Sequence, residues 1–426
     1  MASRAVPWDR QGEAPVGGTM AVAAAIAGNT LEWFDFTVYG LFSLYIGKTF
    51  FPAGDELASL LPALVTYGIG FLLRPLGAIV LGQYADRAGR RAALTLTILL
   101  MLIGSALIAF APTYAQIGPL APALIVLARL IQGFSVGGEM GGATAYLIET
   151  APADRRGLYA SWQYAGQAGA SLGGSLLVAL LTHLLGPAAL FDWGWRIPFI
   201  LGLSIAPIGI YLRSHVPESP AFAAQPLLGK PPLAELWRDH RGALLRAFCL
   251  TIQLTACTYL IVIYMPTYVV HALGVPASTA FTAASVASLL YMVANPLAGR
   301  LSDSIGRPTQ MLAASLLLAV LVYPAFLLIT LHPSALVLTV VPGAMAVILA
   351  MYTGPSAAKV GEMFPPAVRS TGLSLSYNVA VPIFGGFAPY YVTRFDGGDH
   401  MTPAYYMIAC ALPTLATLLW MRGARR

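Results

Sequence analysis

The sequence predicts an all-α membrane protein with twelve transmembrane helices in two six-helix halves, and both termini in the cytoplasm. Three observations support this prediction: an apolar composition, twelve separate apolar stretches, and loop motifs that recur half a chain apart. Hydrophobic residues make up 58% of the chain and charged residues only 10%, with a mean hydropathy of +0.72. A soluble domain carries about 25% charged residues, so composition alone places the chain in a bilayer.

The apolar stretches define the predicted spans, because each crossing of the hydrocarbon needs about 20 mostly apolar residues. Their centres lie near residues 33, 70, 101, 134, 171, 204, 255, 287, 319, 348, 382 and 411. The longest polar segment, 214–241, separates the sixth span from the seventh. We therefore expect a cytoplasmic tail over 1–19, a six-helix half over 20–213, a cytoplasmic linker over 214–241, a second six-helix half over 242–421, and a short tail over 422–426.

Two loop motifs recur in the same order in both halves. Residues 82–91 read GQYADRAGRR, and residues 299–308 read GRLSDSIGRP, which is a separation of 299 − 82 = 217 residues. Residues 149–157 read ETAPADRRG, and residues 362–370 read EMFPPAVRS, a separation of 362 − 149 = 213. Duplicated halves built from membrane spans are typical of secondary transporters.

The basic residues set the orientation. With the N-terminus inside, 19 of the 24 Lys and Arg residues fall in segments assigned to the cytoplasm, and Lys48, Arg196 and Arg394 lie at the outer edges. This asymmetry follows the positive-inside rule. The net charge of +6 therefore reflects topology and implies no nucleic-acid partner. Because the first span is too long and too acidic for a cleavable signal peptide, we expect a multi-pass protein of the inner (plasma) membrane.

The repeated loop contains residues suited to a gating element, which opens and closes one end of the protein. Asp86 and Asp303 follow span ends, where a carboxylate can cap the N-terminus of the next helix and pair with a nearby arginine. Glycines three residues later allow the tight turn. The predicted gating residues are Gly82, Asp86, Arg87, Gly89, Arg90, Asp303, Gly306 and Arg307. Such a contact would act as a latch, holding one conformation until it breaks. The second copy has Pro308 where the first has Arg91, so we expect the latch of the second half to be weaker. Topology anchoring by arginine alone is the alternative interpretation.

Five ionisable residues lie deep in the predicted spans, all in the first half: Glu32, Asp35, Arg74, Arg129 and Glu139. Each costs about 2.5–3.5 kcal/mol at a helix centre, so they must pair, face water or be neutral for part of a cycle. A rise of about 1.5 Å per residue puts Asp35 and Arg129 in an outer layer, and Arg74 and Glu139 nearer the cytoplasm. We expect these to be two pairs, with Glu32 between them. Static pairs that hold helices together are the alternative.

Uncharged polar residues extend this constellation. Asn29 and Tyr39 share a helix face with Glu32 and Asp35 by i, i+3 spacing, which predicts a cavity lining. Gln163, Gln167, Tyr259 and Asn378 project polar groups from other spans, and each is either a substrate contact or a buried structural group. Repeated glycines in the fourth and fifth spans favour close helix packing over a direct ligand role.

Seven blocks carry a resemblance to a known family: GNTLEWFDF (28–36), GFLLRPLGA (70–78), the 82–91 loop, ARLIQGFSVGGE (128–139), DWGWRIPF (192–199), EMFPPAVR (362–369) and SYNVAVPIFGG (376–386). Over residues 18–421 the chain resembles major facilitator superfamily transporters, and within them the metabolite:proton symporters. The loop marks only the superfamily, whereas the first and fourth blocks together are specific to the family. The resemblance is greatest to the citrate and α-ketoglutarate permeases. The chain stops at MRGARR, without the long helical extension of the osmosensing betaine and proline members.

The resemblance implies the major facilitator fold and a proton-coupled importer of an organic di- or tricarboxylate of the citrate, tricarballylate or α-ketoglutarate type. It gives Asp35 and Arg129 the role of a proton-coupling pair, which Glu32 and Glu139 extend. The predicted substrate-binding residues are Arg74, Arg129, Asn29, Tyr39, Gln163, Gln167, Tyr259 and Asn378. Partners are the organic acid, the proton and the bilayer, and we expect a monomer with no cofactor and no metal.

Other functions remain open at this point. A zwitterionic osmolyte such as betaine or proline is the alternative substrate, because Glu32 offers a contact for its cationic end. A membrane-embedded enzyme would need a nucleophile and base or metal ligands at depth, and the sequence has no such constellation. A channel would run without proton coupling, and a receptor on the same scaffold would bind ligand without moving it.

Overall fold

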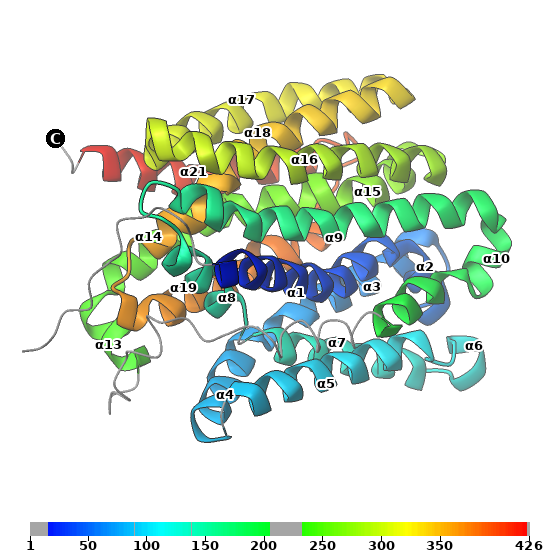
Figure 1. The fold of residues 1–426 in the computed structure, drawn as a ribbon. Helices are drawn as coiled ribbons and strands as arrows, with labels where there is room; N and C mark the ends of the chain where they lie inside the picture. The colour runs from blue at the N-terminus through cyan, green and yellow to red at the C-terminus, as the bar shows by residue number, and fades with distance from the viewer. Residues whose placement is uncertain (1–15, 89, 138, 205–231, 424–426) are drawn as a thin grey trace, which may run out of the picture.

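The computed structural model describes residues 16–88, 90–137, 139–204 and 232–423, all of it in helices and their connections. No side chain is described at 16–25, 28, 31, 82, 83, 85–94, 138–140, 187, 232–234 or 367. The helices run roughly parallel to one long axis (Figure 1). Within the described residues there is no β-strand, as the all-α prediction requires.

Six helical segments precede the linker. They are α1 (Val16–Leu41) with α2 (Ser43–Phe50), α3 (Glu56–Leu72) with α4 (Arg74–Ala88), α5 (Arg90–Ala109), α7 (Leu120–Val136) with α8 (Glu139–Thr150), α9 (Arg156–Leu184), and a helix over residues 197–204. Short connections are α6 (Tyr114–Ile117), α10 (Gly186–Asp192) and the 3₁₀ turn η1 (Gly194–Arg196).

Six more segments follow the short helix α13 (Pro232–Asp239). They are α14 (Arg241–Cys257) continued by η2 (Thr258–Tyr264) and α15 (Met265–Leu273), α16 (Ala277–Ile305), α17 (Arg307–Leu331), α18 (Ala335–Gly361), α19 (Pro366–Val381) continued by η3 (Pro382–Gly386) and α20 (Ala388–Arg394), and α21 (Thr402–Gly423). Twelve segments in two sets of six confirm the predicted fold class. Among the described residues, eight helices are long and apolar enough to cross a membrane.

Two of these segments change winding within the bilayer. Residues of η2 and η3 form π-helical turns inside otherwise α-helical spans. A proline accompanies each turn, Pro382 opening η3 and Pro266 following η2. Proline lacks the N–H that would continue the ladder, and π-turns occur often at functional sites. Hydropathy alone does not reveal either interruption.

The two halves meet along α9 and α16, which lie side by side over most of their length (Figure 1). A Cβ atom built on Gly157 would lie 2.5 Å from the Gly299 carbonyl oxygen, and one built on Gly299 would lie 2.5 Å from that of Gly157. Either methyl group would push the helices apart. Small residues here therefore set the closest approach of the halves.

A second contact between the halves is aromatic. The ring of Phe71 on α3 packs against Gly386 of η3, and the ring of Phe387 packs against Gly68 of α3. Each glycine leaves room for one ring from the other half. This reciprocal packing joins α3 to the segment that carries the second π-turn.

Polar contacts join the halves at both ends of the bundle. At the end where α13 and the C-terminus lie, called the α13 end (Figure 1), Arg369 Nη1 lies 3.2 Å from Glu149 Oε1. At the opposite, α10 end, Glu56 Oε1 lies 3.2 Å from His271 Nδ1, and its Oε2 lies 2.9 Å from Lys48 Nζ. Both ends of the interface are therefore bridged in this structure.

Candidate functional site

Six aromatic side chains enclose two buried arginines near the middle of the bundle. This aromatic cage consists of Trp33, Phe36, Tyr39, Tyr67, Phe71 and Tyr259, all buried. The first three come from α1, the next two from α3, and the last from η2 in the second half. Phe36 is three residues from both Trp33 and Tyr39, so each of these rings lies about one helical turn from it. The Glu-Trp-Phe-Asp-Phe block thus supplies two of the six cage rings as well as two carboxylates.

Arg74 is the first cage cation, and its side chain is fully buried. Its Cζ atom lies 4.5 Å from the ring centroid of Phe36, 4.3 Å from that of Phe71 and 5.1 Å from that of Trp33. None of its guanidinium nitrogens has a hydrogen-bond partner among the described residues. Cation–π contacts offset part of the burial cost, but no described residue supplies an acceptor to the planar set of donors. A guanidinium whose donors are unused can bind a carboxylate through two parallel hydrogen bonds.

Arg129 is the second cage cation, with Cζ 4.4 Å from the Phe36 centroid and 4.5 Å from the Tyr39 centroid. Both guanidinium groups therefore lie against the ring of Phe36. This corrects the prediction of an outer layer with Arg129 and a separate inner layer with Arg74. The depth count placed backbone positions, whereas the long arginine side chains carry both guanidinium groups to the Phe36 ring.

Arg129 does not form the direct ion pair with Asp35 that the sequence predicted. Instead, Arg129 Nη1 donates to Gln132 Oε1 at 2.9 Å, and Gln132 Nε2 donates to the Ser105 hydroxyl at 3.0 Å. The Ser105 hydroxyl in turn donates to Asp35 Oδ2. Two uncharged side chains from α5 and α7 thus stand between the charges. Ser105 and Gln132 were not among the predicted site residues.

Glycines shape the space around these charges. The Arg129 guanidinium packs against Gly70, where a Cβ would lie 2.7 Å from Nη2. A Cβ on Gly133 would collide with the Gly70 carbonyl, so α3 and α7 touch through their backbones at this point. Near Asp35, a Cβ built on Gly202 would collide with the Asp35 Oδ1 atom. That oxygen has no hydrogen-bond partner among the described residues.

The predicted helix face of α1 does not hold together as one lining. Asn29 Nδ2 donates to the Gln163 carbonyl at 3.1 Å, and Gln163 Nε2 donates to Asn29 Oδ1 at 3.0 Å, so Asn29 faces α9. Asp35 faces α5 instead. Six residues turn an α-helix by about 600°, which leaves these two side chains about 120° apart. Spacing of i, i+3 drifts when it is extended over two steps.

The remaining predicted contacts lie in different surroundings. Tyr259 belongs to the cage, and its hydroxyl has no partner among the described residues. Tyr39 stacks on Tyr67 with ring centroids 6.2 Å apart. Asn378 Nδ2 donates to the Gly137 carbonyl at 3.0 Å and so bridges the halves. Gln167 is buried one turn after Gln163 on α9. The structure therefore brings Tyr39 and Tyr259 to the arginines and assigns Asn29, Gln163 and Asn378 to helix contacts.

Two predicted carboxylates receive no assignment from the structure. Glu32 is partly buried on α1, next to the cage residue Trp33. The side chain of Glu139 lies outside the described residues, so its expected pairing with Arg74 stays a prediction.

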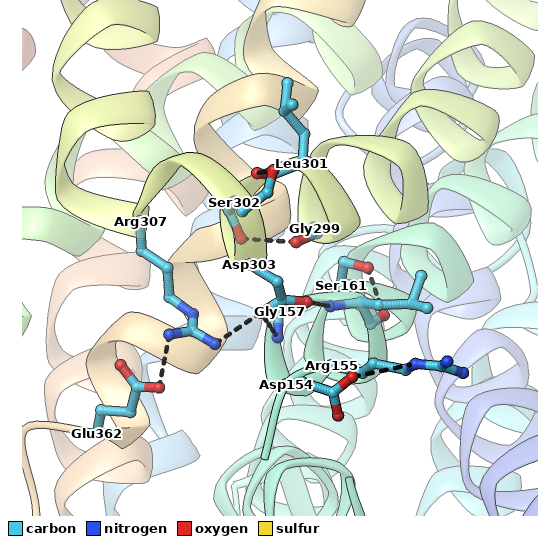
Figure 2. A network of polar contacts seen from close by, with 12 residues as sticks. Asp154, Arg155, Gly157, Ser161, Gly299, Leu301, Ser302, Asp303, Arg307 and Glu362 are labelled. Atoms are coloured by element: carbon cyan, nitrogen blue, oxygen red, sulfur yellow. Dashed lines mark hydrogen bonds and ion pairs between the residues drawn. The ribbon is translucent and has the colours of Figure 1, made fainter. Parts of the chain in front are cut away.

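The second copy of the repeated loop forms a polar network at the α13 end (Figure 2). Asp303 Oδ1 accepts from the backbone N–H of Gly157 at 2.8 Å, and Oδ2 accepts from that of Leu158 at 3.1 Å. Asp303 therefore caps α9, a helix of the other half, and not the next helix as predicted. The close approach of α9 and α16 brings the N-terminus of α9 within reach, and its dipole favours an anion.

Arginine completes the network. Arg307 Nη2 lies 2.8 Å from Asp303 Oδ1, as predicted, and Nη1 lies 2.8 Å from Glu362 Oε1 (Figure 2). Gly306 adopts φ +89°, a conformation that favours glycine at this turn. Pro308 occupies the first turn of α17, where proline is tolerated, and does not prevent the latch.

The first copy of the loop cannot be compared with the second. Gly82 lies in α4, whereas Gly89 and the side chains of Asp86, Arg87 and Arg90 lie outside the described residues, so the gating role of this copy stays a prediction. The contact between Arg369 and Glu149 was also missed, although both residues belong to the second repeated motif. The recurrence of that motif at 149–157 and 362–370 was the sequence feature that could have indicated this contact.

Among the described residues, no group of three His, Cys, Asp or Glu side chains is placed to hold a metal ion. The three cysteines are free thiols. The site thus consists of charged, aromatic and amide groups.

Comparison with known proteins places this geometry in context. The family model described as "Major Facilitator Superfamily" matches residues 24–389 and 248–425. The α-ketoglutarate permease of Escherichia coli K12 is 40% identical over 374 residues, which cover 87% of this chain and 85% of that protein. A citrate-proton symporter of Klebsiella pneumoniae is 37% identical, with coverage of 92% and 89%. A proline/betaine transporter of Salmonella typhimurium is 34% identical, with coverage of 94% and 83%.

A solved structure shares the fold. The proton:xylose symporter XylE, bound to 6-bromo-6-deoxy-D-glucose, superposes with a TM-score of 0.79 over 96% of each chain. Its sequence is 18% identical to this one, so the likeness concerns the fold alone.

Proposed function

The chain belongs to the major facilitator superfamily, and from that premise we propose that it imports an organic di- or tricarboxylate by alternating access, with protons as the driving ions. It is a multi-pass transporter of the inner membrane and not an enzyme. Proton-coupled symport of a small organic substrate is the activity that its relatives support. The carboxylate class and the residue roles below are our proposal.

The observation that carries the proposal is the pair of arginines on one aromatic ring. Arg74 and Arg129 are fully buried, and the Arg74 nitrogens have no acceptor among the described residues. Keeping such donors unsatisfied away from water is costly. A substrate carboxylate would satisfy them with charge-assisted hydrogen bonds, each of about 1.5–3 kcal/mol. The site is therefore built for a ligand that carries negative charge.

The second carboxylate of the substrate would need further donors. The hydroxyls of Tyr67 and Tyr259 are buried without partners among the described residues, and both rings belong to the cage. They are neutral donors on the side of the cage that faces the second half. We assign them to the distal end of a dicarboxylate, with Arg74 at the proximal end.

Coupling follows from the charge of the substrate. An anion that enters a negative interior must bring cations with it, and a buried carboxylate beside an arginine can bind and release a proton as its surroundings change. Asp35 is the described carboxylate joined by hydrogen bonds to a cage arginine. We therefore assign proton binding to Asp35, with the latch at Asp303 closing the α13 end between substrate exchanges.

A zwitterionic osmolyte is the second candidate, because aromatic rings also bind quaternary ammonium groups and a proline/betaine transporter is among the relatives. In this structure, however, the faces of Phe36, Phe71 and Tyr39 are already in contact with arginine guanidinium groups. An ammonium group placed there would be repelled by both cations. The geometry therefore favours an anion.

The test is uptake into proteoliposomes with an inward proton gradient, using radiolabelled α-ketoglutarate and citrate. The proposal predicts accumulation of at least one acid, its loss on addition of a protonophore, and no competition from excess betaine or proline. Accumulation of betaine or proline with neither acid taken up would replace the carboxylate assignment by the osmolyte one.

A further inference from the structure

We propose that Gln132 and Ser105 are positioning residues that transmit the protonation state of Asp35 to the guanidinium of Arg129. The inference rests on the proton-coupled symport proposed above. It names the groups through which the proton and the substrate would influence each other.

The hydrogen bonds form one directional chain. Arg129 donates to the Gln132 carbonyl oxygen, the Gln132 amide donates to the Ser105 hydroxyl, and that hydroxyl donates to Asp35. Every donor points toward the carboxylate, so each bond polarises the next in the same sense. Arg129, Gln132 and Ser105 are at most 1% exposed and Asp35 is 6% exposed, so water does not substitute for any link. We call these four residues the relay.

The surroundings of Asp35 leave one position for the proton. Oδ2 is occupied by Ser105, whereas Oδ1 faces the backbone of Gly202 with no partner among the described residues. Of the charged groups, Arg129 is joined to Asp35 through the relay, and Glu32 lies three residues earlier on α1. Arg74 shares the Phe36 ring with Arg129.

Protonation at Oδ1 changes the far end of the relay. The bond from Ser105 then ends on a neutral acid, and hydrogen bonds to charged acceptors are about twice as strong as neutral ones. The other hydrogen bonds of the relay weaken as well, because hydrogen bonds in a chain strengthen one another by about 10–30% per bond. Arg129 also donates to the Tyr67 carbonyl at 3.3 Å. A weaker relay shifts its balance toward the cage, where the substrate carboxylate would lie.

Loss of the Asp35 charge acts in the same direction. Asp35, Arg74 and Arg129 carry a net charge of about +1 when the carboxylate is ionised and about +2 when it is protonated. A proton on Asp35 therefore favours the anion at the arginines, and a bound anion favours the proton to the same extent by linkage. The relay supplies the orientation that makes this coupling specific to Arg129.

A purely structural role would look different. Gln132 and Ser105 would then hold α5 against α7 equally in both protonation states. Removing either group would lower folding or turnover without separating proton-driven accumulation from substrate exchange. The measurement that separates the two roles therefore compares these activities in the same vesicles.

The experiment uses Ser105→Ala, Ser105→Thr and Gln132→Leu in the full-length protein, reconstituted in proteoliposomes. For each variant, radiolabelled α-ketoglutarate is followed first as accumulation under an inward proton gradient, and then as exchange with the same acid inside. We expect accumulation to fall about tenfold in the alanine and leucine variants while exchange stays within about twofold. Because threonine retains the hydroxyl, Ser105→Thr should restore most of the accumulation.

A pH profile adds a second readout. The Ser105 hydroxyl stabilises the ionised carboxylate, so its removal makes protonation easier. Half-maximal exchange in Ser105→Ala should therefore move to higher pH by about one unit. A helix-packing role for Ser105 would leave this midpoint in place.

Two matched controls stay outside the relay. Ser135, also on α7, is buried and donates to the Thr97 carbonyl at 2.5 Å. Gln253 in the second half is buried and donates to the Ser315 carbonyl at 3.3 Å. The variants Ser135→Ala and Gln253→Leu should keep the wild-type ratio of accumulation to exchange.

The relay is wrong if Ser105→Ala and Gln132→Leu lose exchange and accumulation in parallel, or keep both. It is also wrong if the control variants show the same split. Accumulation by the wild-type protein distinguishes failure of the relay from failure of the proposed function. Should the wild type accumulate betaine or proline and neither acid, the carboxylate proposal fails, and the same comparison with that substrate decides the relay.

Discussion

At the scale of single residues, the site is defined by positive charge placed among aromatic rings. Arg74 and Arg129 both contact Phe36, and the carboxylate that balances them, Asp35, is held at a distance by two neutral groups. A directly paired arginine would be neutralised and unavailable to a ligand. Separation by Gln132 and Ser105 keeps the guanidinium partly free while still linking it to Asp35, the proposed proton-binding group.

Substitution of Arg74 should weaken substrate binding more than folding. We expect Arg74→Gln to raise the KM for α-ketoglutarate about 100-fold, which corresponds to about 2.7 kcal/mol. Arg74→Lys keeps the charge but loses the planar donors, so its effect should be intermediate. Initial rates of uptake over a range of substrate concentrations measure both.

The matched control is Arg394→Gln, since Arg394 also contacts an aromatic ring, that of Phe395 at 5.9 Å, but lies outside the cage. An unchanged KM in Arg74→Gln, or an equal rise in the control, would remove Arg74 from the binding site.

The sequence revealed the charged members of the site and missed Ser105 and Gln132 for a physical reason. A charge inside an apolar span is costly and therefore conspicuous. Serine and glutamine cost far less, so Ser105 and Gln132 stand out only when their neighbours on other helices are known. Asn29 and Gln163 were identified as polar residues of the spans, but the sequence did not show that they bond to each other across two helices.

At the scale of helices, backbone contacts through glycine decide which surfaces can meet. Gly157 and Gly299 set the α9–α16 contact, and Gly70 with Gly133 sets the α3–α7 contact beside Arg129. Small residues of this kind allow the close packing on which helix association in membranes depends.

Alanine at Gly299 should destabilise the protein, because its Cβ would lie 2.5 Å from the Gly157 carbonyl oxygen. Overpacking of this kind costs about 1–3 kcal/mol. Gly142→Ala is the matched control, since Gly142 is also helical but a Cβ there would meet no neighbouring atom within 4 Å. In detergent, Gly299→Ala should unfold at a lower temperature than the wild type, and Gly142→Ala at the same or a higher one. Equal unfolding temperatures would mean that the helices can separate without cost.

The latch at Asp303 provides a prediction about the same two helices. Asp303→Asn removes the charge that binds the α9 N-terminus and Arg307, so the α13 end should open more often. A cysteine at Ser161, which is buried on α9, reports this opening through its rate of thiol labelling. We expect labelling to be about tenfold faster in Asp303→Asn, equivalent to about 1.4 kcal/mol.

This measurement requires that the native cysteines be replaced by alanine, at Cys249, Cys257 and Cys410. The control is Asp154→Asn, because Asp154 lies near the same network (Figure 2) and, among the described residues, forms an exposed ion pair with Arg155 at 3.6 Å. If Asp303→Asn labels no faster than Asp154→Asn, Asp303 does not hold this end closed.

Span positions could be predicted from sequence, whereas the internal breaks could not. The predicted centres near 319, 348 and 411 agree with α17, α18 and α21, because hydrophobic length determines where a helix crosses. Hydropathy does not reveal the change from α3 to α4 or the π-turns η2 and η3, because the sequence stays mostly apolar through each of them.

At the scale of the whole molecule, the duplicated halves are alike in architecture and unequal in chemistry. The cage arginines and Asp35 belong to the first half, while the second half contributes Tyr259, the π-turns and the capping Asp303. The repeat predicted two halves correctly. It could not predict that Asp303 would cap a helix of the other half, since an internal repeat carries no information on which surfaces meet.

Bridges at both ends of the interface suit the alternating access proposed above. Arg369 with Glu149 and Asp303 with the N-terminus of α9 join the halves at the α13 end, and His271 with Glu56 joins them at the α10 end. Opening one side requires that the bridges of that side break while the others hold. The Glu56 side chain is 43% exposed, and exposed ion pairs contribute only about 0–1 kcal/mol each, so the bridge at the α10 end suits a contact that must break in every cycle.

The most direct measurement compares the wild type with Asp35→Asn in proteoliposomes, following both proton-driven accumulation of α-ketoglutarate and its exchange. If Asp35 carries the coupling proton, the asparagine variant should exchange at a rate near that of the wild type and accumulate nothing above equilibrium. Accumulation by Asp35→Asn to the wild-type level would contradict the account, because the proton would then travel by another group.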